Sequence, residues 1–199
     1  DKNKNNIDLD KDKKFENNLF VKIKKNKIFI NKIYKTYNIF GSLGDNMKII
    51  LNMLKKDQFV LSIIKGGLFE NINITTHTRW ASVGEVNLIN THPVMNTNKD
   101  KGLEPLIFSV MNGDIQNHEE IISSIDKFKI HSKNKKLSDT LALSLLFSQK
   151  LLLTNIKKIK EQIKKIDGSF ASISISDEDI SKIILIKKGN AGIYYGKNE

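Results

Sequence analysis

The chain has 199 residues, enough for one domain with its own core, and 39% of them are hydrophobic. It contains no cysteine, which excludes disulfides and thiolate metal sites within it, and its four histidines form no recognisable metal-ligand cluster. No stretch approaches the roughly 20 apolar residues that span a bilayer, and a secretory signal pattern is absent, so we expect a cytoplasmic protein outside the membrane.

A net charge of +11 raises the question of nucleic-acid binding. Most of the positive charge is lysine dispersed among asparagine and isoleucine, whereas a nucleic-acid surface concentrates arginine and interleaves exposed aromatic residues. We therefore expect a solvated basic surface and no nucleic-acid partner. Salt-dependent retention of DNA or RNA would favour the alternative, a basic nucleic-acid binder.

The sequence pattern of the first part of the chain predicts two strands and a helix. Residues 1–18 have almost no apolar content and no periodicity, which predicts a flexible low-complexity insert or tail. Within 19–37, apolar and basic residues alternate on either side of a Lys-Asn pair, which predicts two strands joined by a turn. A short helix is expected at 47–55, and periodicity does not assign the apolar run 58–65.

The second part predicts a buried strand, helices and further strands. The strand is expected at 106–111, and Asn112-Gly113 predicts a tight turn after it. Helices are expected at 118–128, from Asp139 to about 153, and after a cap at Thr154 or Asn155; strands are expected at 169–176, 183–188 and 191–195. This order of strands, helices and strands predicts an α+β fold.

Three segments combine residue types that are unusual for a protein core. The first reads His-Thr-Arg-Trp-Ala-Ser-Val-Gly from His77 to Gly84 and is followed by Asn-Thr-His-Pro at 90–93. The second reads Met-Asn-Gly-Asp-Ile-Gln-Asn-His at 111–118, and the third reads Ser-Asp-Thr at 138–140. In order and approximate spacing they resemble the glutaminase domain of class II, N-terminal-nucleophile glutamine amidotransferases.

The resemblance covers about residues 70 to 196, with weaker similarity at 167–171 and 187–196. The His-Thr-Arg-Trp form is similar to the glucosamine-6-phosphate synthase branch of the family, the isomerizing glutamine–fructose-6-phosphate aminotransferases. The resemblance implies an N-terminal-nucleophile hydrolase-type αββα sandwich of stacked antiparallel sheets. On this interpretation residues 19–199 form a glutaminase domain that is truncated at both ends.

The resemblance also implies an activity. L-glutamine would be hydrolysed to glutamate and ammonia through a cysteine thioester, and the ammonia would pass to a sugar phosphate, fructose 6-phosphate, through domains that are not in this chain. The glutaminase step needs no cofactor or metal, and we expect a homo-oligomer in the complete protein.

Hydrolysis of a carboxamide requires a nucleophile, a base, oxyanion donors and groups that hold the substrate. Arg79 can hold an α-carboxylate bidentately, and Asp139 can pair with an α-ammonium. The Asn112 side chain and the Gly113 N–H can form an oxyanion hole, and the resemblance assigns the same roles to these positions. It further implies three groups of residues: Trp80 closing over glutamine, Ser82 and His92 as substrate-binding residues, and His77 and Thr78 as structural parts of the motif.

Each of these residues singly has an ordinary explanation, as an ion pair, a core residue, a turn or a helix cap, so it is their combination that indicates a site. The nucleophile of the family is an N-terminal cysteine, whereas this chain begins with Asp1 and contains no cysteine. We favour a fragment of a longer enzyme over an inactive relative, and we expect the chain alone to be inactive. Another class II amidotransferase and a non-catalytic glutamine-binding module are the alternatives.

Overall fold

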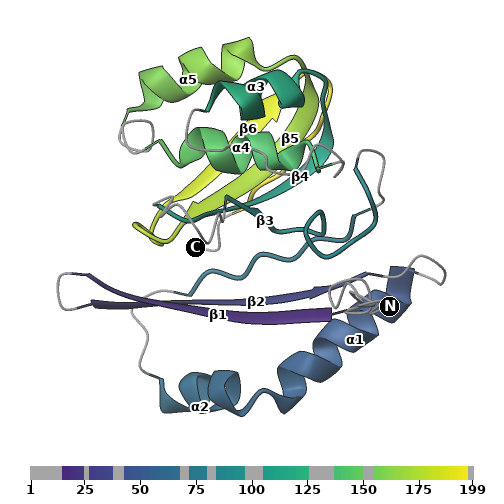
Figure 1. Ribbon diagram of the computed structural model, residues 1–199. Helices are drawn as coiled ribbons and strands as arrows, with labels where there is room; N and C mark the ends of the chain where they lie inside the picture. The colour runs from purple at the N-terminus through teal and green to yellow at the C-terminus, as the bar shows by residue number, and fades with distance from the viewer. Residues whose placement is uncertain are drawn as a thin grey trace, which may run out of the picture.

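The computed structural model describes residues 15–24, 27–37, 43–67, 72–79, 84–96, 105–125, 137–149 and 155–196. These residues form a two-stranded and a four-stranded antiparallel sheet and five helices. Figure 1 shows the two sheets facing each other, with helices on the outer side of each. The predicted α+β class of stacked antiparallel sheets and covering helices therefore agrees with the structure. None of the described helices is long and apolar enough to cross a membrane.

The two-stranded sheet is a hairpin of β1 (Phe15–Lys24) and β2 (Lys27–Thr36). Two strands were expected within 19–37, and both are present; the residues of the predicted turn lie outside the described part of the chain. Strand β1 begins earlier than the alternation predicted, because the last four residues of the segment 1–18 pair with the end of β2. The expectation of a flexible segment is therefore wrong for these four residues, and residues 1–14 lie outside the description.

Helices α1 (Leu43–Lys56) and α2 (Gln58–Gly66) lie on the outer side of the hairpin (Figure 1). The first is the helix expected at 47–55, and the second is the apolar run that periodicity left unassigned. Asp57 joins them to β2: its side chain caps α2 by accepting from Val60 N at 3.2 Å, and it also binds Tyr34 Oη at 2.8 Å and Lys32 Nζ at 3.0 Å.

The four-stranded sheet has the order β3 (Val94–Met95), β4 (Ile107–Ile115), β5 (Gly168–Ser176) and β6 (Ile183–Lys188). The strands expected at 106–111, 169–176 and 183–188 are confirmed, whereas β3 was not predicted.

Two turn and strand predictions are wrong. Asn112-Gly113 is not a tight turn, because β4 runs through both residues to Ile115 in register with β5. Gly113 lies opposite Phe170. The strand expected at 191–195 is absent from the described residues: this segment has no regular structure, and Tyr194 and Tyr195 are 98% and 87% exposed. A strand needs a partner that accepts its hydrogen bonds, and no described strand pairs with this segment.

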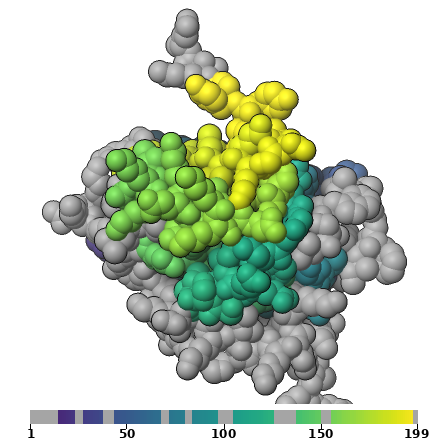
Figure 2. Space-filling view, turned by 90° about the horizontal axis from the view of Figure 1, so that it is seen from above, coloured from purple at the N-terminus to yellow at the C-terminus, as the bar shows by residue number. Residues whose placement is uncertain are grey.

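Helices α3 (His118–Ser124), α4 (Thr140–Phe147) and α5 (Ile156–Lys165) cover the other face of this sheet (Figure 1). Figure 2 shows the teal-green α3 and the light-green α5 on this face, with the yellow C-terminal residues beside them. All three helices start where the sequence predicts, and Asn155 caps α5. Two of them end earlier than expected: α3 ends at Ser124 and not at 128, and α4 ends at Phe147 and not at about 153, with non-helical described residues after each.

The main core lies between α4 and the four-stranded sheet, and all eight residues of α4 are buried. Burial of each large apolar side chain there, such as Phe147 or Phe170, contributes roughly 1.5–3 kcal/mol. The two sheets also contact each other, since the rings of Phe20 and Phe108 lie 6.1 Å apart. Burial of α4 fixes the position of its N-terminus, which carries one of the predicted site residues.

Candidate functional site

A cavity of about 490 Å³ lies beside the second half of β4 and the start of α4. This volume falls within the range of roughly 300–1,000 Å³ that is usual for small-molecule sites. Seven of the predicted site residues line it together, although they come from four separate segments: His77, Thr78, Arg79, His92, Asn112, Gly113 and Asp139. Met111, Asp114 and Thr140 also line it. Trp80 and Ser82 lie outside the described residues, so their roles stay predictions.

Arg79 brings a positive charge to this cavity from the extended segment 72–79. The side chain is half-buried, and burial lowers the pKa of its guanidinium, whereas the nearby charge of Asp139 acts in the opposite direction. An arginine stays protonated despite such a shift. The cavity therefore contains a fixed cation that interacts with a carboxylate also lining its wall.

Asp139 is held in place by backbone donors. It precedes α4, where its Oδ1 accepts from Thr140 N at 2.9 Å, and its Oδ2 accepts from Ile115 N at 2.9 Å. Next to it, Ser138 N donates to Asn90 Oδ1 at 2.7 Å, which fixes the residue before the helix. Ser138 Oγ also donates to Oδ1 at 3.4 Å, and since a carboxylate has about four acceptor positions, these three bonds leave capacity for a ligand. The structure thus gives Asp139 a helix-capping role and also places it in the cavity wall.

The backbone of β4 is irregular at Gly113. Gln116 N donates to Asp167 O at 2.8 Å on the side of β5, whereas Ile115 N donates to Asp139 on the opposite edge. Gly113 lies two residues before Ile115, and its φ of +117° departs from the extended geometry in which N–H groups alternate between the two edges of a strand. In the described register, β3 pairs only near the start of β4, and the Gly113 end of the strand lines the cavity.

His92 connects two walls of the cavity. Its Nε2 lies 2.8 Å from Thr140 Oγ1, and its ring lies 4.3 Å from the ring of His77. Burial and then the charges of His77, Arg79 and Lys35 hold the pKa of His92 far below its usual range, so the imidazole is neutral near pH 7. The pKa of His77 is also lowered, by burial and then by Arg79. Each lowered pKa makes the ring a weaker proton acceptor than a free imidazole.

A smaller cavity of about 110 Å³ adjoins the first and shares His77, Thr78, Arg79 and His92 with it. Its other walls come from β2, α1 and the segment 84–96. Lys35 lines it and is only 3% exposed. From the dispersed lysines of the sequence, a solvated position was expected for this residue. A signal was present, because Lys35 lies two residues after the buried Ile33 and therefore on the same face of the strand.

Comparison with known proteins agrees with the geometry at a coarse level. No protein-family model matches the chain. The isomerizing glutamine–fructose-6-phosphate aminotransferase of Buchnera aphidicola is 28% identical over 162 residues, which cover 79% of this chain and 25% of that protein. The enzyme of the same name from Thermotoga maritima is 27% identical over 173 residues, 82% of this chain and 26% of the relative.

A third relative of the same name, from Vibrio parahaemolyticus, is 25% identical over 114 residues, 57% of this chain and 17% of that protein. The chain thus spans about a quarter, or less, of the length of these curated relatives. At this low identity the shared name supports a relation to aminotransferases that use glutamine.

Proposed function

We propose that this chain is the glutamine-handling part of a glutamine–fructose-6-phosphate aminotransferase, which releases ammonia from L-glutamine for amino-sugar synthesis. The observation that supports this most is the meeting of Arg79, Asp139 and the Gly113 edge of β4 in one cavity. These groups come from separate parts of the chain, and they offer a cation, a carboxylate and a hydrogen-bond donor. The names of the related enzymes add glutamine and fructose 6-phosphate as the substrates of the complete enzyme.

Arg79 and Asp139 suit the two charged ends of a free amino acid. The guanidinium binds the α-carboxylate through two parallel hydrogen bonds, and the carboxylate of Asp139 accepts from the α-ammonium. Because Asp139 is fixed by backbone donors, the bound amino acid takes one orientation. This orientation directs the side-chain carboxamide along β4, toward Asn112 and Gly113.

The hydrolysis begins when a thiolate attacks the carboxamide carbon and places negative charge on its oxygen. The Gly113 N–H and the Asn112 amide stabilise this charge, and each such donor contributes about 2.7–4 kcal/mol to the transition state. The C–N bond then breaks, the nitrogen leaves as ammonia with the proton of the thiol, and water hydrolyses the thioester to glutamate. This chain contains no cysteine, so we assign the thiol to a part of the complete protein outside these 199 residues.

The same proposal includes the fold and the rest of the enzyme. We assign the arrangement of helices, sheet, sheet and helices to the N-terminal-nucleophile hydrolase type, and residues 19–199 to a partial glutaminase domain. The sugar-phosphate site and the contacts of a homo-oligomer belong to the remainder of a longer, cytoplasmic enzyme. A non-catalytic glutamine-binding module is the second candidate, and the lack of cysteine in this sequence is the observation that favours it.

Calorimetric titration with matched analogues tests the binding roles. L-glutamine is compared with its α-amide, which lacks the α-carboxylate charge, and with glutaramate, which lacks the α-ammonium. Each lost charge-assisted contact is worth about 1.5–3 kcal/mol, so each analogue should bind roughly 10- to 150-fold more weakly to the wild-type chain. Arg79→Met should abolish the preference for glutamine over the α-amide, and Asp139→Asn should abolish the preference over glutaramate.

Lys157→Met, a change at an exposed lysine of α5, is the matched control and should leave all three affinities unchanged. The binding assignment is wrong if both site variants keep the wild-type preferences. The protein expressed from the complete open reading frame is assayed for glutamate release from glutamine. This separates the two candidate functions, since a glutaminase releases glutamate and a non-catalytic binding module does not. Arg79→Ala and Asp139→Ala should each lower this release.

A further inference from the structure

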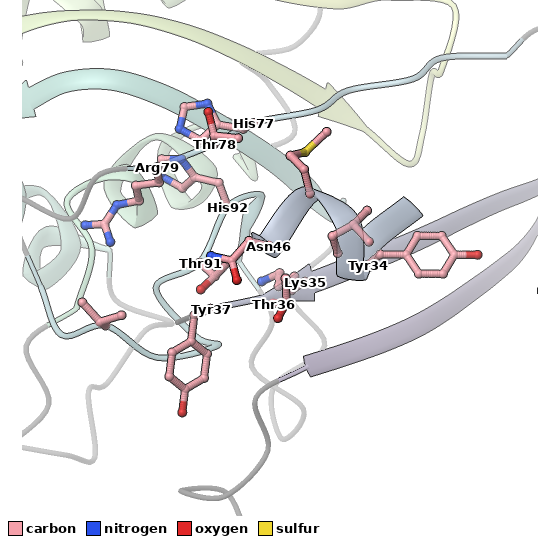
Figure 3. A pocket seen from close by; sticks show the side chains of 13 residues that line it. Tyr34, Lys35, Thr36, Tyr37, Asn46, His77, Thr78, Arg79, Thr91 and His92 are labelled. Carbon is pink, nitrogen blue, oxygen red and sulfur yellow. The ribbon is translucent and has the colours of Figure 1, made fainter. Parts of the chain in front are cut away.

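The smaller cavity contains polar groups that the proposed glutaminase reaction does not use. It lies between β2, α1 and the segments that carry His77 and His92. Figure 3 shows the side chains of Lys35, Asn46 and Thr91 close to one another, with His92 and His77 beyond them. Of these residues, Lys35, Asn46 and Thr91 do not line the larger cavity. Any ligand held by these three side chains therefore binds beside the glutamine position and outside it.

The wall of this cavity is positively charged. Lys35 and Arg79 contribute cations, and the described residues that line it include no carboxylate. Lys35 Nζ donates to Leu88 O at 3.5 Å, whereas an ammonium group has three N–H donors. The carboxylates that act on the two cations, Glu16 on Lys35 and Asp139 on Arg79, are not among the lining residues. A buried ammonium with so little compensation is costly unless a ligand pairs with it.

Two buried polar atoms of the lining residues lack a hydrogen-bond partner among the described residues: Asn46 Oδ1 and His92 Nδ1. Such atoms are rare, because buried polar groups in folded proteins are nearly always paired. When the Thr140 hydroxyl donates to Nε2 of the neutral His92, Nδ1 carries the proton and becomes a donor. The Asn46 amide can present its nitrogen in place of its oxygen, since the two ends have the same shape. Both groups can then donate to one ligand.

We propose that the smaller cavity is a subsite for one small anion, a carboxylate or phosphate group, which binds Lys35 Nζ, His92 Nδ1 and the Asn46 amide. A volume of about 110 Å³ is well below the roughly 300 Å³ at which small-molecule pockets begin, so one such group fits and a larger ligand does not. The competing occupant is a cluster of ordered waters, which also fits a polar cavity of this size. The proposal does not depend on glutamine binding, because Lys35 and Asn46 belong to this cavity alone.

The anion is detected by its effect on thermal unfolding of the 199-residue chain, measured without glutamine. Inorganic phosphate and sodium acetate are titrated separately at pH 7, and a bulky sulfonate too large for the cavity keeps the ionic strength constant. The unfolding temperature of the wild-type chain should rise and saturate, because a ligand of the folded state stabilises it. If phosphate saturates the effect at a lower concentration than acetate, the subsite is one for phosphate. If acetate saturates it at the lower concentration, the subsite is one for a carboxylate.

Two variants make the assignment specific. Lys35→Met removes the cation and should weaken binding roughly tenfold or more, as expected for loss of a charge-assisted hydrogen bond. Asn46→Asp keeps the shape of the side chain but adds a carboxylate, and it should abolish binding through repulsion. Lys157→Met on α5 should bind as the wild type does. Circular dichroism confirms that each variant is folded before its titration is interpreted.

The pH dependence gives a second readout. Burial, opposed by Glu16, lowers the pKa of Lys35 to about 8. Affinity for acetate, which keeps its charge in this range, should therefore fall as pH rises above 8, by up to about tenfold per unit. His77 and His92 have lowered pKa values and stay neutral there, and Arg79 stays charged. Two phenols, Tyr34 and Tyr37, also line the wall, so the same pH series on Lys35→Met isolates the contribution of the amine.

The outcomes separate the anion from water. Saturable stabilisation that Lys35→Met and Asn46→Asp both reduce supports the anion subsite. If neither anion stabilises the wild-type chain, the smaller cavity contains water only. If the anions stabilise Lys35→Met as much as the wild type, they bind elsewhere. Either result overturns the proposal. The glutamine titration rests on variants at Arg79 and Asp139, and the anion titration rests on variants at Lys35 and Asn46, so each proposal can fail without the other.

Discussion

Substitution of Gly113 by alanine tests the close packing of β4 against β5 beside the larger cavity. Gly113 has a φ of +117°, which an L-residue with a side chain rarely adopts. A Cβ atom at this position would lie 2.2 Å from Ser169 O and 2.7 Å from Phe170 Cα, both of them backbone atoms of β5. The alanine variant can form only if β4 and β5 separate locally.

The expected cost has two parts. The unfavourable φ costs about 1–2 kcal/mol, and overpacking against backbone adds about 1–3 kcal/mol, so Gly113→Ala should lower the free energy of unfolding by about 2–5 kcal/mol. Gly67→Ala is the matched control: Gly67 also has a positive φ, +63°, but its Cβ would meet no atom within 4 Å. It should lose only the backbone part, about 1–2 kcal/mol.

Urea unfolding, followed by circular dichroism, gives both values from the shift of the midpoint at constant slope. The Gly113→Ala variant should also bind glutamine more weakly than the wild type, because β4 is displaced at the cavity wall. Equal stability losses in the two variants would refute the close approach of β4 to β5 at Gly113.

Two further predictions concern the buried groups around the site. Thr140→Val leaves His92 Nε2 without its partner at 2.8 Å and should cost about 1–3 kcal/mol in urea unfolding, whereas Thr140→Ser should restore most of the loss. Burial lowers the pKa of Lys35 from 10.5 to about 8 in the folded chain, so between these pH values the unfolded chain retains a proton that the folded chain has lost. The free energy of unfolding should consequently rise with pH over this window, by up to about 3 kcal/mol, in the wild type relative to Lys35→Met. A flat difference between the two proteins would contradict the burial of this amine.

Much of the fold was predictable because local patterns and long-range pairing agree. The alternation in 19–37 gives the hairpin, and the cap at Asn155 gives the start of α5. Asn112-Gly113 failed as a turn because the pairing of β4 with β5 overrides the local preference of this dipeptide. The strand prediction for 191–195 was wrong because an alternating pattern does not by itself provide a partner strand.

The candidate site was predictable in part. The order of the motifs identified Arg79, Asn112 and Asp139, which the structure brings to one cavity. The contact of His92 with Thr140 was not predictable, because it joins residues 48 positions apart. The burial of Lys35 was also missed, although the lysine shares a strand face with Ile33, because the dispersed lysines around it suggested a solvated surface.

The most direct measurement of the central claim follows the backbone amide of Gly113 by NMR during a titration with L-glutamine. If the carboxamide oxygen binds this N–H, its resonance should move, with a saturation curve that gives the calorimetric affinity. The amide of Gly168, in β5, is the internal reference and should move much less. Saturable binding of glutamine with a Gly113 resonance that stays in place would contradict the account.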